Sequence, residues 1–325
     1  MKVAVVGCGG MGSIHAHSYA KMPAVKLVGV CDIRMEMAEE LAGETGTTAF
    51  GSLEAMITAV DPDVVSITLP SYLHKDYVCK AADFGKHIIC EKPLALTSND
   101  AEEISRYCEH KGVQLYVGHV VRFFPEYVRM KQEIDAGRVG RVGVAHARRV
   151  GEHPGNKSLW FKEMEKSGGV ILDLMVHDID YMRWTLGEVK SVYCLNHRDE
   201  KMDYALVTLV FHNGTIANLE GFWGYPGSFR TSAEFAGSKG IIQNDSMASQ
   251  SLHIRKASVN FDRSKFAEVP QSPGYKSPYD LELAHFLACI QEQQEPRVTA
   301  KDACQAVRIA EAALESARTG NVVML

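Results

Sequence analysis

Short apolar runs alternate with helical patterns over the first 118 residues of the chain. Each run is only four or five residues long and is mostly valine, isoleucine and leucine, as expected of strands that helices cover on both faces. Such alternation predicts βαβ units and a parallel sheet. The expected strands are residues 3–6, 27–31, 64–68, 87–90 and 114–117, and the expected helices are residues 14–22, 35–45, 52–60, 77–84 and 99–110.

After Gly118 the alternation stops, and longer strand-like runs separated by turns follow. They are residues 142–149, 191–195, 205–211, 215–221 and 231–236. Asn213 and Gly214 form a hairpin signal, because the N-G dipeptide supplies the positive φ angles that a tight turn needs. This half therefore predicts an α+β domain with a large, mostly antiparallel open sheet. Residues 243–274 are polar and poorly periodic, and we expect mixed strands and loops there.

Two helices are expected near the end of the chain. The second begins at the N-cap Thr299, with Asp302 three residues on, and ends near Gly320. A chain of 325 residues exceeds the usual size of one core, so we expect two domains, residues 1–118 and 119–325. The last helices are candidates to pack back on the first domain. The first of them carries one apolar stripe at helical spacing, formed by Leu283, Phe286, Leu287 and Ile290.

Composition narrows the class of protein. Hydrophobic residues make up 46% of the chain and charged residues 23%, and the net charge of -5 is modest, so nothing indicates nucleic acid or a membrane surface as a partner. No apolar stretch approaches the roughly 18 residues of a membrane span, and we expect no secretory signal. The eight cysteines are scattered without a C-x-x-C pair. We therefore expect a cytoplasmic protein with reduced thiols.

The first expected strand runs directly into a glycine-rich turn. Gly7 permits a tight turn, Gly9 lets the backbone approach a pyrophosphate, and Gly12 allows close contact between helix and strand. The helix that follows, with Gly10 and Met11 at its start, offers free N–H groups and a positive dipole end to phosphates. A strand before and a helix after this G-x-G-x-x-G predict a dinucleotide site. The alternative is a glycine turn in another α/β fold.

Asp32 ends the next expected strand, 20 residues after Gly12. A carboxylate at this position accepts hydrogen bonds from the ribose hydroxyls and repels a 2′-phosphate, which favours NAD over NADP. Arg34 lies two residues later and can pair with that phosphate, so the use of NADP stays open.

Three further motifs accompany this fingerprint. They are Leu69-Pro70 through His74, Glu91-Lys92-Pro93 after the fourth apolar run, and Gly168-Gly169-x-x-x-Asp173-x-x-x-His177 in the second half. Their order and spacing resemble the glucose-fructose oxidoreductase and inositol dehydrogenase family (Gfo/Idh/MocA). The resemblance spans essentially the whole chain, including the Arg122-Phe123 segment and the closing helices.

The resemblance implies a first domain that binds NAD(P) and a second that supplies substrate contacts and the oligomer interface. It places Pro70, His74, Glu91 and Lys92 near the cofactor. It also implies a homodimer or homotetramer. For the substrate, the weaker pocket candidates are His119, His153, Trp160 and Tyr279, for which ordinary packing is the alternative.

Lys92 is the strongest catalytic candidate. It follows an expected parallel strand, and open α/β sheets bind ligands at the carboxyl ends of their strands. A solvated surface lysine is the alternative. The resemblance implies that Lys92 acts at the reacting carbon.

Asp173 and His177 are four residues apart, so on a helix they share one face and converge on a substrate. Their neighbours are apolar and would bury this helix, so a core histidine with satisfied partners is the alternative. The resemblance implies a substrate-binding aspartate and a general-base histidine. A divalent metal is a further alternative, but no additional ligand cluster is evident and we expect no metal. Its ligands would come from Asp173, His177, Asp178 and Asp180.

Together these residues predict a dehydrogenase. Hydride would pass from a secondary alcohol of a sugar, cyclitol or polyol to NAD(P). His177 would take the hydroxyl proton, Lys92 would stabilise the developing alkoxide, and Asp173 would hold a neighbouring hydroxyl. Two alternatives stay open: an NAD-dependent glycoside hydrolase that uses transient oxidation, and a non-catalytic NAD(P)-binding regulator. A regulator has no need of a proton-transfer set, which argues against it.

Overall fold

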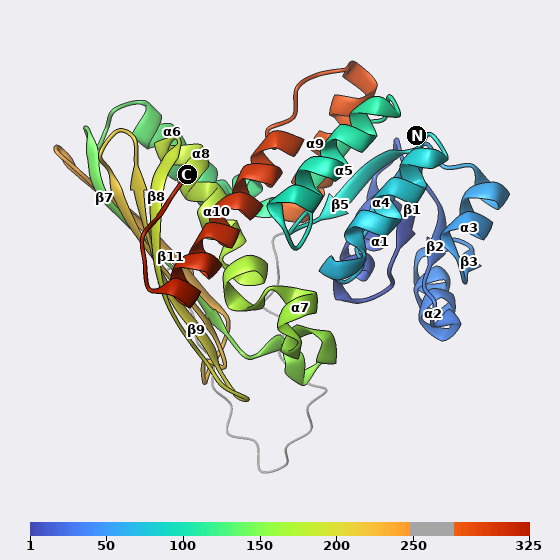
Figure 1. Cartoon of the computed structure of the whole chain (residues 1–325). Coiled ribbons are helices and arrows are strands. Elements are labelled where there is room, and N and C mark those ends of the chain that lie inside the picture. The colour runs from blue at the N-terminus through green and yellow to red at the C-terminus, as the bar shows by residue number, and fades with distance from the viewer. Residues whose placement is uncertain (248–275) are drawn as a thin grey trace, which may run out of the picture.

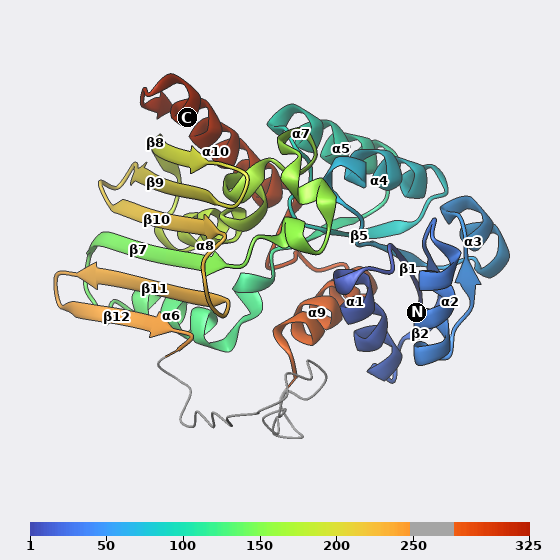
Figure 2. The same cartoon turned by 90° about the horizontal axis from the view of Figure 1, so that it is seen from below.

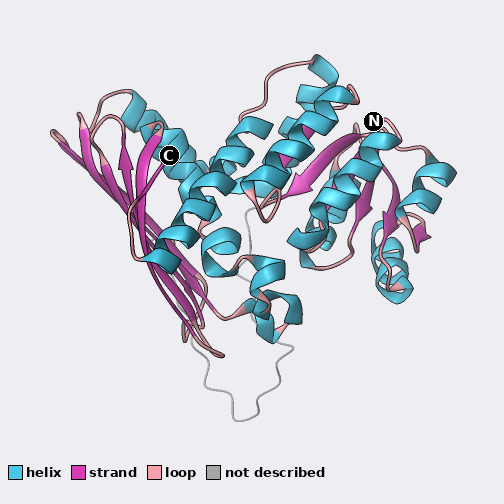
Figure 3. Ribbon diagram, viewed as in Figure 1, coloured by secondary structure: helices cyan, strands magenta, loops and turns pink. Residues whose placement is uncertain are grey.

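Two β-sheets and their helices make up the protein (Figure 1). The structure, a computed structural model, describes residues 1–247 and 276–325. The helices of the second sheet lie on the side that faces the first sheet (Figure 3). Within the described ranges, no helix is both long and apolar enough to cross a membrane.

The first sheet is parallel throughout and has the strand order β3-β2-β1-β4-β5-β6. This is the order of the doubly wound dinucleotide-binding fold, and it reverses between β1 and β4, where such folds bind their ligands. The strands are β1 (Lys2–Val6), β2 (Lys26–Cys31), β3 (Ala49–Phe50), β4 (Val64–Ile67), β5 (His87–Glu91) and β6 (Leu115–Gly118).

Helices cover both faces of the first sheet because its strands are apolar on both. Val3 and Val5 of β1 pack with helices α1, α2 and α9, whereas Ala4 and Val6 pack on the other face with α3, α4 and α5. The helix α9 therefore belongs to the core of the first sheet although it lies late in the chain. The bounds are α1 (Gly10–Lys21), α2 (Met35–Thr45), α3 (Leu53–Val60), α4 (His74–Asp83), α5 (Ser98–His110) and α9 (Pro278–Glu292).

The second sheet has the order β12-β11-β7-β10-β9-β8-β13, and its strands lie side by side in Figure 2. Every neighbouring pair among the described strands is antiparallel except β7 with β10, which is parallel. The strands are β7 (Val142–Gly151), β8 (Val189–Arg198), β9 (Asp203–Phe211), β10 (Ile216–Trp223), β11 (Arg230–Gly237), β12 (Gly240–Asp245) and β13 (Val323–Met324).

Helices α6 (Pro125–Asp135), α8 (Val176–Leu186) and α10 (Ala300–Thr319) cover the inner face of this sheet. The alternation in β9 fits this arrangement, because Ala205, Val207 and Leu209 are buried while Leu206 between them is exposed. Short turns of helix complete the chain: η1 (Ser71–Leu73), η2 (Val120–Phe123), η3 (Pro154–Asn156), η4 (Leu159–Lys162), α7 (Met164–Ser167) and the π-helix η5 (Val170–Leu174).

The predicted fold class is confirmed, together with the expected strands and the closing helices. The predicted capping box of Thr299 and Asp302 is present, and Gly320 ends α10 with φ 71°. The prediction for the hairpin was partly wrong. Gly214 has a positive φ but Asn213 does not, because the Asn213 side chain instead accepts the N–H of Thr215.

Some elements were not predicted. The strands β3 and β13 have two residues each, which is too short for a pattern, and α6 is mostly polar. Residues 243–245 of the segment expected to hold mixed strands and loops end β12, and residues 248–274 lie outside the described residues.

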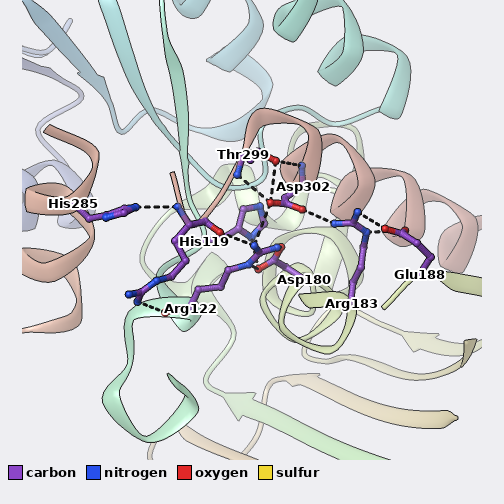
Figure 4. Close-up of polar contacts among 9 residues, drawn as sticks. His119, Arg122, Asp180, Arg183, Glu188, His285, Thr299 and Asp302 are labelled. Atoms are coloured by element: carbon purple, nitrogen blue, oxygen red, sulfur yellow. Dashed lines mark hydrogen bonds and ion pairs between the residues drawn. The ribbon is translucent and has the colours of Figure 1, made fainter. Parts of the chain in front are cut away.

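A buried arginine joins the segment after the first sheet to two helices of the second (Figure 4). The Arg122 side chain in η2 is 1% exposed. It donates to both carboxylate oxygens of Asp180 on α8, at 2.8 and 2.6 Å, and to Asp302 at the start of α10, at 3.2 Å. Asp302 also accepts from Arg183 at 2.6 Å. Burial raises the pKa of the Asp302 carboxyl, but Arg122, the backbone N–H of Thr299 and Arg183 outweigh this effect and lower it to about 2.

Replacing Arg122 should destabilise the protein strongly. Arg122→Leu leaves Asp180 buried without its ion-pair partner, and removing one member of such a pair costs about 3–5 kcal/mol. The free energy of unfolding in urea measures this loss. Arg138→Leu is the matched control, because that side chain is 76% exposed and its pair with Glu133 contributes little. Equal stability of the two variants would show that the buried pair does not hold the fold.

Candidate active site

A cleft of about 480 Å³ opens at the point where the strand order of the first sheet reverses. The segment of η4 from the second half of the chain forms its opposite wall. The cleft brings together the predicted residues Gly7, Gly9, Gly10, Met11, Asp32, Arg34, Pro70, Glu91, Lys92, Trp160 and Asp173. Ile14, Thr68, Leu69, Ser71, Ser158 and Phe161, which were not predicted, also line it.

The glycine-rich turn between β1 and α1 has the shape that a pyrophosphate requires. A Cβ atom on Gly12 would lie 1.7 Å from the carbonyl oxygen of Gly7, so only glycine permits this contact of helix and strand. A Cβ atom on Gly9 would meet no protein atom within 4 Å, so the backbone there faces open space. The Thr68 hydroxyl fixes the turn, because its one proton is shared between the carbonyl oxygens of Val6 and Gly7 at 2.9 and 2.8 Å. The amino end of α1 then supplies N–H groups for an anion.

Asp32 lies at the carboxyl end of β2, on the floor of the same cleft. Its two carboxylate oxygens accept the backbone N–H groups of Cys8 and Arg34, each at 2.9 Å. These bonds orient the carboxylate next to the glycine-rich turn, where the ribose of a dinucleotide would lie. The Arg34 side chain is mostly exposed and reaches Asp32 only at 3.5 Å.

The open backbone at Gly9, the amino end of α1 and the oriented carboxylate of Asp32 fit NAD. Gly9 and the first turn of α1 would hold the pyrophosphate, and Asp32 would hold the adenosine ribose.

Glu91 ends β5 and is almost fully buried. Its carboxylate interacts with Nε2 of His15 at 3.1 Å and accepts the backbone N–H of Lys92 at 3.2 Å. Burial raises the pKa of Glu91, but the His15 contact and the Lys92 charge outweigh this effect and hold it below its ordinary value. The other ring nitrogen of His15 meets the hydroxyl of Ser66 at 2.7 Å. Glu91 thus anchors the start of the segment that carries Lys92.

Lys92 reaches from the first sheet to the second half of the chain. Its ammonium group donates to the carbonyl oxygen of Asp173 at 2.7 Å and to the Asp173 carboxylate at 3.2 Å. Asp173 lies in the π-helix η5, where the N–H of Met175 bonds to the carbonyl of Val170. The two residues before η5, Gly168 and Gly169, both have positive φ, so the chain enters this turn in a conformation that favours glycine.

The structure corrects one step of the sequence argument. Asp173 and His177 were expected on one regular helix, but Asp173 belongs to η5 and His177 to the start of α8. His177 does not line the cleft, and its Nδ1 atom is buried without a hydrogen-bond partner among the described residues. Burial lowers the pKa of His177 well below its ordinary value, and Lys92, Arg149 and His119 act in the same direction.

Two of the residues considered as metal ligands, Asp178 and Asp180, form ion pairs with arginines instead. Asp178 accepts two hydrogen bonds from Arg149 of β7, both at 2.9 Å, and Asp180 accepts two from Arg122. In the described part of the chain, no group of three or more histidine, cysteine or acidic side chains is placed to bind a metal ion.

The remaining predicted residues differ in where they lie. His74 is buried, and its ring nitrogens face the carbonyl oxygens of Pro93 and Leu69, both at 2.8 Å, rather than the cleft. His153 accepts the N–H of Gly155 and so caps η3. Tyr279 of α9 is partly buried, and burial together with the charge of Glu91 raises its pKa to about 12.

Trp160 lies in the wall of the cleft. Its ring stacks on Phe161 with 3.8 Å between centroids and meets the edge of Tyr72 from η1. His119 is fully buried, and neither of its ring nitrogens has a partner in the described ranges.

Sequence reasoning missed His15 and Arg149. His15 meets Glu91 across 76 positions of the chain, and Arg149 meets Asp178 across 29. The available signal was a charged or polar residue within an apolar pattern, since such a group needs a partner when buried. That signal does not name the partner.

The strand order, the glycine-rich turn, Asp32 and the lysine-aspartate pair that faces them define an NAD-dependent oxidoreductase. More specifically, the chain belongs to the Gfo/Idh/MocA oxidoreductase family. The model of its NAD-binding Rossmann fold matches residues 1–119, and that of its C-terminal alpha/beta domain matches residues 131–325. The family, the enzyme class and NAD as cofactor, all predicted from the sequence, are confirmed.

Several known proteins are similar to this chain. The scyllo-inositol 2-dehydrogenase (NAD(+)) of Bacillus subtilis is 32% identical over 340 residues, which cover 100% of this chain and 96% of the relative. The crystal structure of a putative myo-inositol dehydrogenase from Sinorhizobium meliloti 1021 superposes with a TM-score of 0.86 at 25% identity, covering 100% and 99% of the two chains. GenD2 from gentamicin A biosynthesis, solved with NAD, shares the fold with a TM-score of 0.89 at 23% identity, covering 100% and 96%.

Two glycine variants test the cofactor site. Gly9→Ala should fold normally, because its Cβ atom meets no protein atom, yet lose NAD affinity because that atom occupies the space of the pyrophosphate. Gly12→Ala should lose both stability and NAD affinity. Thermal unfolding and titration with NAD measure the two properties. Gly43→Ala in α2, which also has open space around it, is the control that should keep NAD affinity and lose no stability, because alanine favours the helix. Unaltered NAD affinity of Gly9→Ala would exclude a pyrophosphate at this turn.

Proposed function

We propose that Lys92, Asp173 and His177 act together in the reversible oxidation of a secondary alcohol of a sugar, cyclitol or polyol. The family and the scyllo-inositol 2-dehydrogenase relative support this substrate class. The observation that carries the proposal is the Lys92 ammonium group, held against two oxygens of Asp173 in the NAD cleft. When bound, NAD supplies the hydride acceptor, and the protein supplies position and electrostatics.

Lys92 orients the alcohol and stabilises negative charge on its oxygen. A lysine ammonium has three donors, and two of them go to Asp173. The third can donate to the substrate oxygen, where charge develops as the hydroxyl proton and the hydride leave. The second carboxylate oxygen of Asp173, which makes no hydrogen bond within the described ranges, can accept a neighbouring hydroxyl. A polyhydroxylated ring offers such a neighbour, which supports a sugar or cyclitol.

His177 is the proposed base. A histidine accepts a proton only in its neutral form, and the surroundings of His177 favour that form. The sequence alone predicts that the rate of oxidation rises with pH near neutrality. Because burial and the nearby cations lower the pKa of His177, we expect the rise at lower pH and a plateau through neutrality.

Asp32 supports NAD rather than NADP as the working cofactor, because its carboxylate would repel a 2′-phosphate. We also propose that the chain divides into domains near residue 118, where β6 ends and before any strand of the second sheet begins. The eight free thiols support a reducing compartment such as the cytoplasm.

Lys92→Ala and His177→Ala should each lower the turnover number about a hundredfold or more, the usual loss when electrostatic or acid-base assistance is removed. NAD affinity should change little. NADH absorbance, with scyllo-inositol, myo-inositol and a panel of aldoses as substrates, measures turnover. Lys111→Ala and His110→Ala at the surface end of α5 are the matched controls.

Near-full turnover of His177→Ala between about pH 6 and pH 9 would remove histidine from the chemistry. Net release of NADH with a free sugar or cyclitol separates this function from transient oxidation by a glycoside hydrolase, which returns its hydride.

The outer face of the second sheet supports a homodimer or homotetramer. No described helix covers this face, and it carries exposed apolar side chains. Neighbouring strands contribute Val144 of β7, Leu206 of β9 and Ile216 of β10, and Val144 pairs directly with Ile216 in the register of the sheet. Exposed apolar surface of this kind marks a protein interface.

The protein should therefore be a dimer or tetramer at micromolar concentration. Leu206→Glu should weaken the assembly, because it buries a charge in the proposed interface. Phe84→Glu, at an exposed apolar residue after α4, is the control. Light scattering measures the mass of both variants and of the unaltered protein. A monomer in the unaltered protein would disprove the proposed interface.

A further inference from the structure

His119 is a buried histidine next to the proposed catalytic residues. In the parallel register of β5 and β6, Glu91 pairs with Gly118. Lys92 and His119 therefore follow side by side at the carboxyl edge of the sheet. The His119 side chain is 1% exposed, and both ring nitrogens lack a hydrogen-bond partner in the part of the chain that the structure describes. Buried polar atoms nearly always have partners, so this imidazole needs an explanation.

The Nδ1 atom of His177 has the same property, since it is buried and makes no hydrogen bond within residues 1–247 and 276–325. Three groups lie close enough to shift the pKa of His177: Lys92, Arg149 and His119. Lys92 and Arg149 can only donate hydrogen bonds, and they donate to Asp173 and Asp178. Of these three groups, His119 is thus the one that can accept a hydrogen bond from His177.

The surroundings of His119 suit an acceptor. Its Nδ1 atom faces a carboxylate oxygen of Asp180 at 3.8 Å, so a proton on Nδ1 leaves the lone pair of Nε2 free. Burial lowers the pKa of His119, and Asp180 and Asp302 oppose this effect while Arg122 and Lys92 support it. The net effect is a lowered pKa, which keeps the ring neutral near pH 7, and only a neutral imidazole can accept a hydrogen bond.

We propose that His119 is a positioning residue for His177. It accepts the Nδ1–H of His177 through one bound water, which would give both unpartnered nitrogens a hydrogen bond, and so fixes the tautomer whose Nε2 takes the hydroxyl proton of the substrate. The proton from the substrate stays on Nε2 of His177, and the charge of Asp180, 3.8 Å from Nδ1 of His119, favours a proton on that atom. This inference rests on the proposed function of His177 as the base.

Two variants test it. His119→Phe fills the space without an acceptor, and His119→Gln keeps an acceptor that cannot titrate. With scyllo-inositol, myo-inositol or the best aldose as substrate, His119→Phe should lower kcat on the order of tenfold, the value of one hydrogen bond, and leave KM and NAD affinity nearly unchanged. His119→Gln should recover most of kcat. His87→Phe, at the amino end of β5, is the control that should keep full activity.

Nitrogen NMR of histidine labelled in the ring gives a readout without substrate or cofactor. The His177 signals are assigned by their loss in His177→Ala. In the unaltered protein Nδ1 of His177 should carry the proton, whereas His119→Phe should show a mixture of the two tautomers.

An unchanged tautomer in His119→Phe would overturn the inference. A loss of kcat in His119→Phe that His119→Gln does not recover would also overturn it. So would an equally large loss of kcat when His119→Phe is added to the His177→Ala variant. These outcomes leave the proposed function intact if His177→Ala itself loses turnover. Full turnover of His177→Ala would instead disprove the proposed function.

Discussion

Two acidic side chains of α8 are buried, and each is held by an arginine from another part of the fold. Asp178 pairs with Arg149 of β7, and Asp180 pairs with Arg122 of η2. An unpaired buried carboxylate costs several kcal/mol, so α8 is stable only where both guanidinium groups reach it. Because η2 follows β6 of the first sheet and β7 belongs to the second, these pairs fix α8 relative to both sheets. His177 lies next to Asp178 and takes its position from them.

Burial is the main reason that His177 stays neutral, and charges that hold the site together act in the same direction. Arg149 and Lys92 both act on His177 and favour its neutral form, while the acidic partner of each cation holds it in place. One set of ion pairs therefore orients the histidine and adds to the effect of burial on its proton affinity. Such a fixed arrangement needs no reorganisation when charge develops during the reaction, which is how enzymes stabilise transition states most effectively.

The sequence predicts the features that depend on nearby residues. The glycine-rich turn, Asp32 after the second strand and the capping box at Thr299 are all local, and all three lie where they were expected. Asp302 shows where local reasoning ends. Its role as a helix cap was predicted from neighbouring residues, but its pair with Arg122 joins residues 180 positions apart and was not predicted. The π-helix η5, whose hydrogen-bonded turn holds one residue more than an α-helical turn, was also not predicted. A π-helix and an α-helix show the same apolar pattern over so few residues.

Because of the additional residue in this turn, the number of residues in the segment, rather than their types, determines how Asp173 is oriented. Each residue of an α-helix turns the chain by about 100°, so removing Leu174, the residue of η5 that follows Asp173, would rotate Asp173 relative to His177 by that angle. The Asp173 carboxylate, which pairs with Lys92, and the His177 ring would then no longer keep their present relative orientation. The apolar residues of η5 can change as long as they stay apolar, whereas an insertion or deletion between Asp173 and His177 would change the relative orientation of the two side chains. Among related proteins, the residues of this segment should therefore vary in type, whereas the number of residues should stay the same.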